Sequence, residues 1–177
     1  ILKNKNIISL LRLGAPLIIN NLAIAGIQLT DALMAGRLGA KELAAVAVGG
    51  SVWFLIFQTY NGLMMAISAI VSRLYGAKEV SLIGRYNRQA CFMSLIIGIS
   101  VIFLFHIYIA SFMNFIGIDT EFRHLVVDYL NAIIFGAPGI FLFLVFRYTT
   151  EGIGYTRPVM YSSLIALILN VFFNYVF

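Results

Sequence analysis

The sequence is poor in charge and in cysteine. Charged residues make up 11% of the chain, against about 25% in a typical soluble domain. The single cysteine, Cys91, excludes an intrachain disulfide, and no Cys/His cluster of the zinc-binding type is present. Hydrophobic residues reach 62% and the mean hydropathy is +0.98. A water-soluble globular domain is therefore excluded, and we predict an integral membrane protein.

No convergent set of nucleophilic or metal-binding residues is visible, so we expect neither an enzyme nor a bound cofactor. The net charge of +5 does not indicate a nucleic-acid partner, because basic residues in so apolar a chain first set its orientation in the membrane. The chain starts at Ile1 rather than at a methionine and stops at Phe177 within an apolar run. We therefore expect an internal fragment of a longer protein. We expect no secretory signal peptide, because the first apolar segment is too long for one and no small-residue cleavage site follows it.

Five charge-free runs divide the sequence, at 13–30, 43–72, 89–118, 129–146 and 158–177. Each is close to or above the roughly 20 residues that a helix needs to cross a bilayer. The run 43–72 is too short for two spans and a turn, so we expect one over-long helix there. The prediction is an all-α polytopic membrane protein with five transmembrane helices, at about 8–35, 42–73, 86–114, 124–150 and 157–177.

The basic residues favour a cytoplasmic amino terminus. With five spans in that orientation, nine basic residues fall on the cytoplasmic side and three on the outer side, which follows the positive-inside rule. The nine are Lys3, Lys5, Arg12, Arg73, Lys78, Arg85, Arg88, Arg147 and Arg157, and the three are Arg37, Lys41 and Arg123.

Proline and glycine mark the expected helix bends. Pro16 is predicted to bend the first helix near its cytoplasmic end, because proline removes a hydrogen bond from a helix interior. Gly49-Gly50 and Asn61-Gly62 are the expected bends of the second helix, and Gly136-Ala137-Pro138-Gly139 that of the fourth.

Asp31 is the most informative polar residue. Either the first span ends near Thr30 and Asp31 lies among the lipid headgroups, or the helix continues through Ala32–Ala35 and the carboxylate lies inside the membrane. The residues support both interpretations equally. A carboxylate inside a membrane is a candidate site for a proton or a cation.

Polar side chains recur at helical spacing near this acid and on other helices. Asn20 and Gln28 share the first helix with Asp31, and Ser163, Asn170 and Asn174 form one narrow stripe on the last helix. Gln58 and Asn61 belong to a similar seam on the second helix. Hydrogen bonding between helices is one interpretation of these seams, and a polar cavity is the other. Glu151 lies in a stretch predicted to be a solvated cytoplasmic turn.

Five segments in order give the chain a resemblance to the MATE family of multidrug and toxin extruders, most closely to its NorM-like bacterial branch. They cover nearly the whole chain and read LLRLGAPLIINN, TDALMAGRLGAKELAAVAVG, SRLYGAKE, RYTTEGIGYTRPVMY and LILNVFFNYVF. The resemblance implies twelve helices in two lobes, with this chain as the amino-terminal lobe without its sixth helix. It also implies that the partner of this lobe is the carboxy-terminal lobe of the same protein, and that the full-length protein is a monomer.

The resemblance places Asp31 on the family's first-helix carboxylate, which takes part in proton or cation binding. Asn170 matches an asparagine of the same site, and Pro16 matches the proline where the first helix is thought to bend. Asn174 stands where archaeal members have an aspartate, so a carboxylate pair is absent from this lobe. Ile24 replaces a glutamine of many members, and Gln28 or Asn20 are the candidates to compensate.

The function implied is an antiporter of the bacterial inner membrane that exports cationic, amphipathic drugs by alternating access, in exchange for H⁺ or for Na⁺ at Asp31. Gln28, Asn20, Gln58 and Asn61 are candidates for the substrate site or polar cavity. One alternative is a lipid-linked glycan flippase of related fold, which should carry basic residues at mid-depth, and the helices here have none there. The other is a membrane subunit that transports nothing.

Overall fold

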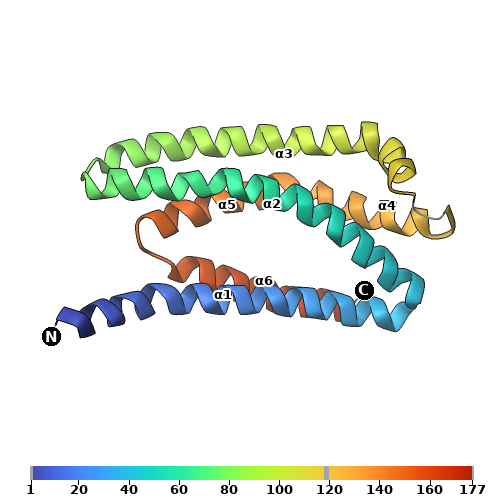
Figure 1. Ribbon diagram of the computed structural model, residues 1–177, viewed down its shortest axis with the longest axis horizontal. Helices are drawn as coiled ribbons and strands as arrows, with labels where there is room; N and C mark the ends of the chain where they lie inside the picture. The colour runs from blue at the N-terminus through green and yellow to red at the C-terminus, as the bar shows by residue number, and fades with distance from the viewer. Residues whose placement is uncertain (1, 118–119, 177) are drawn as a thin grey trace.

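The computed structural model describes residues 2–117 and 120–176, and these form six helices and no strand. In chain order they are α1 (Leu2–Leu38), α2 (Ala40–Gly76), α3 (Val80–Ile116), α4 (Thr120–Phe135), α5 (Ala137–Gly152) and α6 (Arg157–Val176), as Figure 1 shows. The predicted all-α fold is confirmed. The helices extend beyond most of the predicted bounds, because polar residues at the ends of the apolar runs continue them; residue 177 lies outside the described part.

By length and composition, the described helices offer four membrane spans, and a fifth if α4 and α5 count as one. α1, α2, α3 and α6 each contain a segment long and apolar enough to cross a membrane, whereas α4 and α5 meet this criterion only as a pair, which is bent by 46°. The run 43–72 lies within one unbroken helix of 37 residues, as predicted. α1 continues through Pro16 without a break, so the bend predicted there stays a prediction.

The bend between α4 and α5 lies at the predicted Gly136. The Gly136 amide donates to the carbonyl of Ile133 at 3.1 Å, which closes a tight turn, and Pro138 stands in the first turn of α5, where its missing N–H costs nothing. Across from it, a Cβ added at Gly98 of α3 would lie 2.6 Å from the Cα of Pro138. The bent span therefore packs backbone to backbone against α3, as small residues allow in membrane helices.

The helices divide into two sets. α1 packs most extensively against α6, whereas α5 packs against α2 and α3, and α4 packs against α2. Figure 1 shows the α1/α6 pair as a separate layer beside the four-helix group of α2, α3, α4 and α5. The α1–α2 turn at one end and the α5–α6 connection at the other join the two sets.

The buried core lies in the four-helix group. Its centre is Phe141 of α5, which is fully buried and stacks on Tyr60 of α2 with ring centroids 3.8 Å apart. Trp53 stacks on the same ring at 6.3 Å. A second cluster joins α2, α3 and α4 around Met113, Val126 and Leu130. This group is therefore the packed scaffold of the chain.

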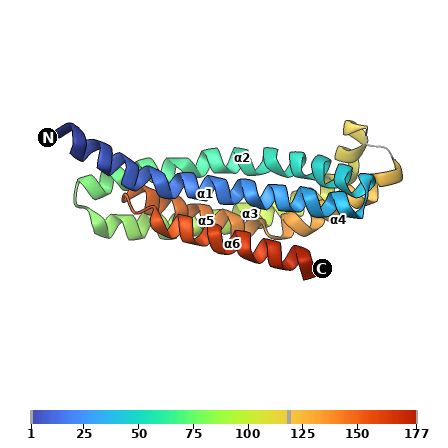
Figure 2. The same ribbon diagram turned by 90° about the horizontal axis from the view of Figure 1, so that it is seen from below.

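The two ends of the bundle differ in charge. The amino terminus, the α2–α3 turn and the α5–α6 connection lie together at one end, which we call the basic end, whereas the carboxyl end of α6 lies toward the other (Figures 1 and 2). The basic end receives the nine residues predicted for the cytoplasmic side, and the opposite end receives the three predicted for the outside. The described fold is thus consistent with the predicted orientation.

Candidate ion-binding site

Asp31 lies inside an apolar span rather than beyond it. The span in α1 covers Leu13–Leu38, and the helix continues for seven residues after Asp31. At 1.5 Å per residue, the carboxylate is roughly 10 Å from the end of the helix. The candidate span of α1 thus includes Asp31, and its place inside the membrane stays a prediction.

Asp31 meets the asparagine stripe of α6. Its Oδ1 accepts hydrogen bonds from the Nδ2 of Asn170 at 2.8 Å and from the Nδ2 of Asn174 at 2.7 Å. The two asparagines are four residues apart, which places them one above the other on the same helix face. Two N–H donors converging on one carboxylate oxygen stabilise negative charge there. The structure therefore brings together all three residues that the sequence analysis assigned to an ion site.

One oxygen atom at this site has unused capacity. Asn170 Oδ1 is buried and accepts no hydrogen bond from the residues that the structure describes. It belongs to the same side chain whose Nδ2 donates to Asp31. A buried carbonyl oxygen without a partner is energetically costly, and carboxylate and amide oxygens are the ligands that hard cations prefer. The donor set therefore suits a proton or a small cation such as Na⁺.

Tyr129 of α4 also belongs to this neighbourhood, although the sequence analysis did not single it out. Its hydroxyl is within electrostatic range of Asp31. The ring occupies the space beside Gly49, where an added Cβ would lie 2.5 Å from Tyr129 Cδ1. The absence of a side chain at Gly49 thus makes room for the tyrosine. The signal in the sequence was the Gly49-Gly50 pair, which was interpreted as a bend.

Asn20 and Gln28 do not join the ion site. Asn20 is buried, 1% exposed, and donates a long hydrogen bond of 3.4 Å to Asn21 Oδ1. It precedes Asp31 by eleven residues, about 16 Å along the helix. Gln28 and Ile24 are exposed. The predicted compensation for the missing glutamine is therefore not seen as a contact with Asp31.

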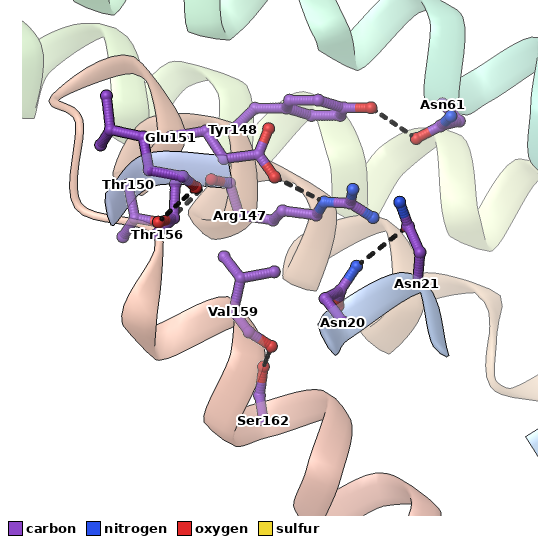
Figure 3. Close-up of polar contacts among 11 residues, drawn as sticks. Asn20, Asn21, Asn61, Arg147, Tyr148, Thr150, Glu151, Thr156, Val159 and Ser162 are labelled. Atoms are coloured by element: carbon purple, nitrogen blue, oxygen red, sulfur yellow. Dashed lines mark hydrogen bonds and ion pairs between the residues drawn. The ribbon is translucent and has the colours of Figure 1, made fainter. Parts of the chain in front are cut away.

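Gln58 and Asn61 belong to a second polar cluster. Tyr148 of α5 donates from its hydroxyl to Asn61 Oδ1 at 2.7 Å, as Figure 3 shows. Asn61 Nδ2 in turn donates to Gln58 Oε1 at 3.2 Å. These contacts join α2 to α5. The interpretation as hydrogen bonding between helices therefore holds for Asn61, whose partner Tyr148 the sequence analysis missed.

Glu151 is part of the same region and corrects the prediction of a solvated turn. α5 runs to Gly152, so Glu151 is in its last turn. Its Oε1 accepts a hydrogen bond from Arg147 Nε at 2.9 Å, and the side chains of Arg147 and Glu151 are only 18% and 16% exposed. The residue is folded into the helix because an acid and a base at i and i+4 face each other.

Two further polar contacts fix the basic end. Thr149 donates to Asn87 Oδ1 of α3 at 2.9 Å, and Thr156 donates to the carbonyl of Leu13 in α1 at 3.2 Å. The segment 147–151, RYTTE, thus contributes hydrogen bonds to α2 and α3 and an ion pair within α5. In the sequence, this role could have been suspected from the run of polar residues that follows the apolar run 129–146.

Comparison with known proteins adds three findings. The MatE family model matches residues 16–176. The chain is 32% identical over 171 residues to the multidrug resistance protein MdtK of Photorhabdus laumondii, covering 96% of this chain and 37% of the relative. It is 29% identical to the probable multidrug resistance protein NorM of Halalkalibacterium halodurans, over 91% of this chain and 35% of that relative.

Solved structures show the same fold. A MOP superfamily transporter from Pyrococcus furiosus and an outward-facing multidrug resistance MATE family transporter each align with a TM-score of 0.87 at 23% identity, covering 94% of this chain and 37% of theirs. The chain therefore spans a little over a third of the length of the proteins it matches. Because the MatE family model matches almost the whole length of this chain, the chain belongs to the MatE family of transporters, and its apolar helices fit a multi-pass membrane protein.

Proposed function

We propose that the chain is the amino-terminal lobe of a secondary antiporter that exports organic cations in exchange for H⁺ or Na⁺. The observation that carries the proposal is the contact of Asp31 with Asn170 and Asn174, with an unpartnered Asn170 Oδ1 beside it. The multidrug resistance relatives support the drug substrates, and the coverage of about a third supports a second lobe in the same protein.

The geometry gives the ion a way to act on the helices. With Asp31 ionised and no cation bound, both amides donate to Oδ1 and hold α1 against α6. A proton or cation on the carboxylate reduces its strength as an acceptor, since charge-assisted hydrogen bonds are roughly twice as strong as neutral ones. Loading of the ion thus weakens the contact between α1 and α6, and this change drives the alternation of access.

Transport by the full-length protein tests the proposal. In inside-out vesicles, an imposed pH or sodium gradient should drive uptake of a cationic dye by the wild type, and Asp31→Asn should abolish the gradient-driven part. The matched control is Asp128→Asn, which removes the same charge from an exposed position on α4. Normal coupling in Asp31→Asn would contradict the site, and absence of dye transport in the wild type would contradict the antiporter.

A further inference from the structure

Arg147 is a charged side chain at the basic end that the proposed ion site does not use. It lies in α5, five residues before the helix ends, and its side chain is 18% exposed. In the view of Figure 3, the Arg147 side chain is drawn between Tyr148 and Asn61 on one side and Asn20 and Asn21 on the other. The guanidinium is therefore largely covered by other groups of the described chain but not fully buried.

Most of the hydrogen-bonding capacity of Arg147 is unused. A guanidinium has five N–H donors in a planar fork. Only Nε is engaged, with Glu151 Oε1 at 2.9 Å, and the two Nη groups donate to no residue in the described part of the chain. The Tyr148 ring lies 5.6 Å from Arg147 Cζ and covers one side of the group. The Nη edge is thus held in place and open to a ligand.

The chemistry of this edge selects an oxyanion. Two parallel N–H donors match the two oxygens of a carboxylate, and this geometry is a reason why arginine is favoured for carboxylate recognition. Glu151 already uses the Nε side, which leaves the Nη edge for a second carboxylate.

We infer that the Nη edge of Arg147 binds the carboxylate of zwitterionic amphipathic substrates. The inference rests on the proposed export function and deepens it, since it assigns the recognition of a negatively charged substrate group to a residue outside the ion site. Arg147 and Asp31 lie on different helices, and their hydrogen-bond partners differ: Glu151 for Arg147, and Asn170 and Asn174 for Asp31. A substrate carboxylate at Arg147 therefore does not compete for the contacts of Asp31.

A pair of dyes that differ only at the carboxylate tests the inference. Rhodamine B carries a free carboxylate and is zwitterionic, whereas its ethyl ester is purely cationic. In vesicles containing the full-length protein, Arg147→Gln should raise the KM for rhodamine B at least about tenfold, the size expected for a lost charge-assisted hydrogen bond. The KM for the ester should stay within about twofold of the wild type, because the ester offers no anionic oxygen to the guanidinium.

Control variants separate recognition from folding. Arg157→Gln removes a basic residue from an exposed position at the same end and should leave both dyes unaffected. The double variant Arg147→Gln/Glu151→Gln removes both members of the ion pair. In this variant no Glu151 carboxylate is left unpaired, so an unpaired acid cannot cause the change in transport. The double variant should show the same selective loss for rhodamine B, and transport of the ester verifies that each variant is folded.

The outcomes separate this inference from the function on which it rests. If the wild type fails to transport the ester, the proposed export of cations is wrong. If the ester is transported and Arg147→Gln changes neither dye, the carboxylate site is wrong. If both dyes are impaired equally, and only in vesicles that contain phosphatidylglycerol, Arg147 binds a lipid phosphate instead and the inference is overturned.

Discussion

The α1/α6 pair and the four-helix group are both built from apolar helices, yet different side chains join them. In the four-helix group, Phe141 and Met113 are completely buried among aromatic and aliphatic residues. Between α1 and α6, the contacts include the hydrogen bonds from Asn170 and Asn174 to Asp31, and Thr156, just before α6, donates to the Leu13 carbonyl of α1. The two helices also approach closely at Gly26, where the absence of a side chain leaves room for Leu167.

This difference separates stability from response. Packing of large side chains does not depend on ions, so the four-helix group should keep its shape through the transport cycle. The contact between α1 and α6 includes a carboxylate, so its strength depends on what that carboxylate binds. Substitutions in the buried apolar core of the four-helix group should therefore mainly change stability, and those of the polar contacts between α1 and α6 should mainly change transport.

The largest effect is expected from Phe141→Ala. Removing a fully buried ring at the centre of the four-helix group should lower the free energy of unfolding by about 3–5 kcal/mol, because a cavity remains. Phe143→Ala, two residues away and 39% exposed, is the control and should cost much less. Thermal unfolding of the purified full-length protein measures both losses. Equal losses would contradict the description of the four-helix group as a packed scaffold centred on Phe141.

Gly98→Ala should have the next largest effect. Its Cβ would lie 2.6 Å from the Cα of Pro138, so the bent span must move away, at a cost of about 1–3 kcal/mol. Gly84→Ala on the same helix has no atom within 4 Å of the added Cβ and should be neutral or stabilising. A Gly98→Ala protein that unfolds at the wild-type temperature would show that α3 and α5 do not pack as described.

Asn174→Ala tests the other side of the comparison. It removes one hydrogen bond to Asp31, and such bonds in membranes contribute about 0.6 kcal/mol on average. Unfolding should hardly change, whereas gradient-driven dye transport should fall severalfold because Asp31 loses a donor. Tyr175→Ala, at the neighbouring exposed position, should preserve both. If Asn174→Ala instead lowers stability strongly and leaves transport intact, the α1–α6 contact serves stability rather than the response to the ion.

The smallest effect is expected from Thr156→Val, which removes the hydrogen bond to the Leu13 carbonyl. The predicted destabilisation is again about 0.6 kcal/mol, because one neutral bond between the α5–α6 connection and α1 is lost. Thr59→Val is the control, since the Thr59 hydroxyl bonds only to the Leu55 carbonyl of its own helix at 2.9 Å. Hydrogen exchange at the start of α6 should increase in the first variant and not in the second.

Features that depend on local sequence were predictable. The single long helix over 43–72 follows from the length of the apolar run, and the bend at Gly136 follows from the glycine and proline beside it. The α1–α6 contact was expected from the family resemblance, which assigned Asp31, Asn170 and Asn174 to one site; the polar pattern alone did not select α6.

Features that depend on distant pairs were not predictable from one sequence. Asn61 and Tyr148 are 87 residues apart, and periodicity places each on a helix face without identifying the facing helix. Glu151 was assigned to a turn because glycine residues follow it, yet the ion pair with Arg147 keeps it in α5. Tyr129 is not part of any polar stripe in the sequence, and its position beside α2 is known only from the packing of its ring over Gly49.

The length of α2 and α3 has a practical consequence. Each helix has 37 residues, which is about 55 Å of helix against a hydrocarbon core of about 30 Å. Both helices are therefore longer than the core and end together at the turn between Gly76 and Val80, so we expect this turn to lie outside the hydrocarbon. An epitope or a fluorophore attached there should be accessible from water.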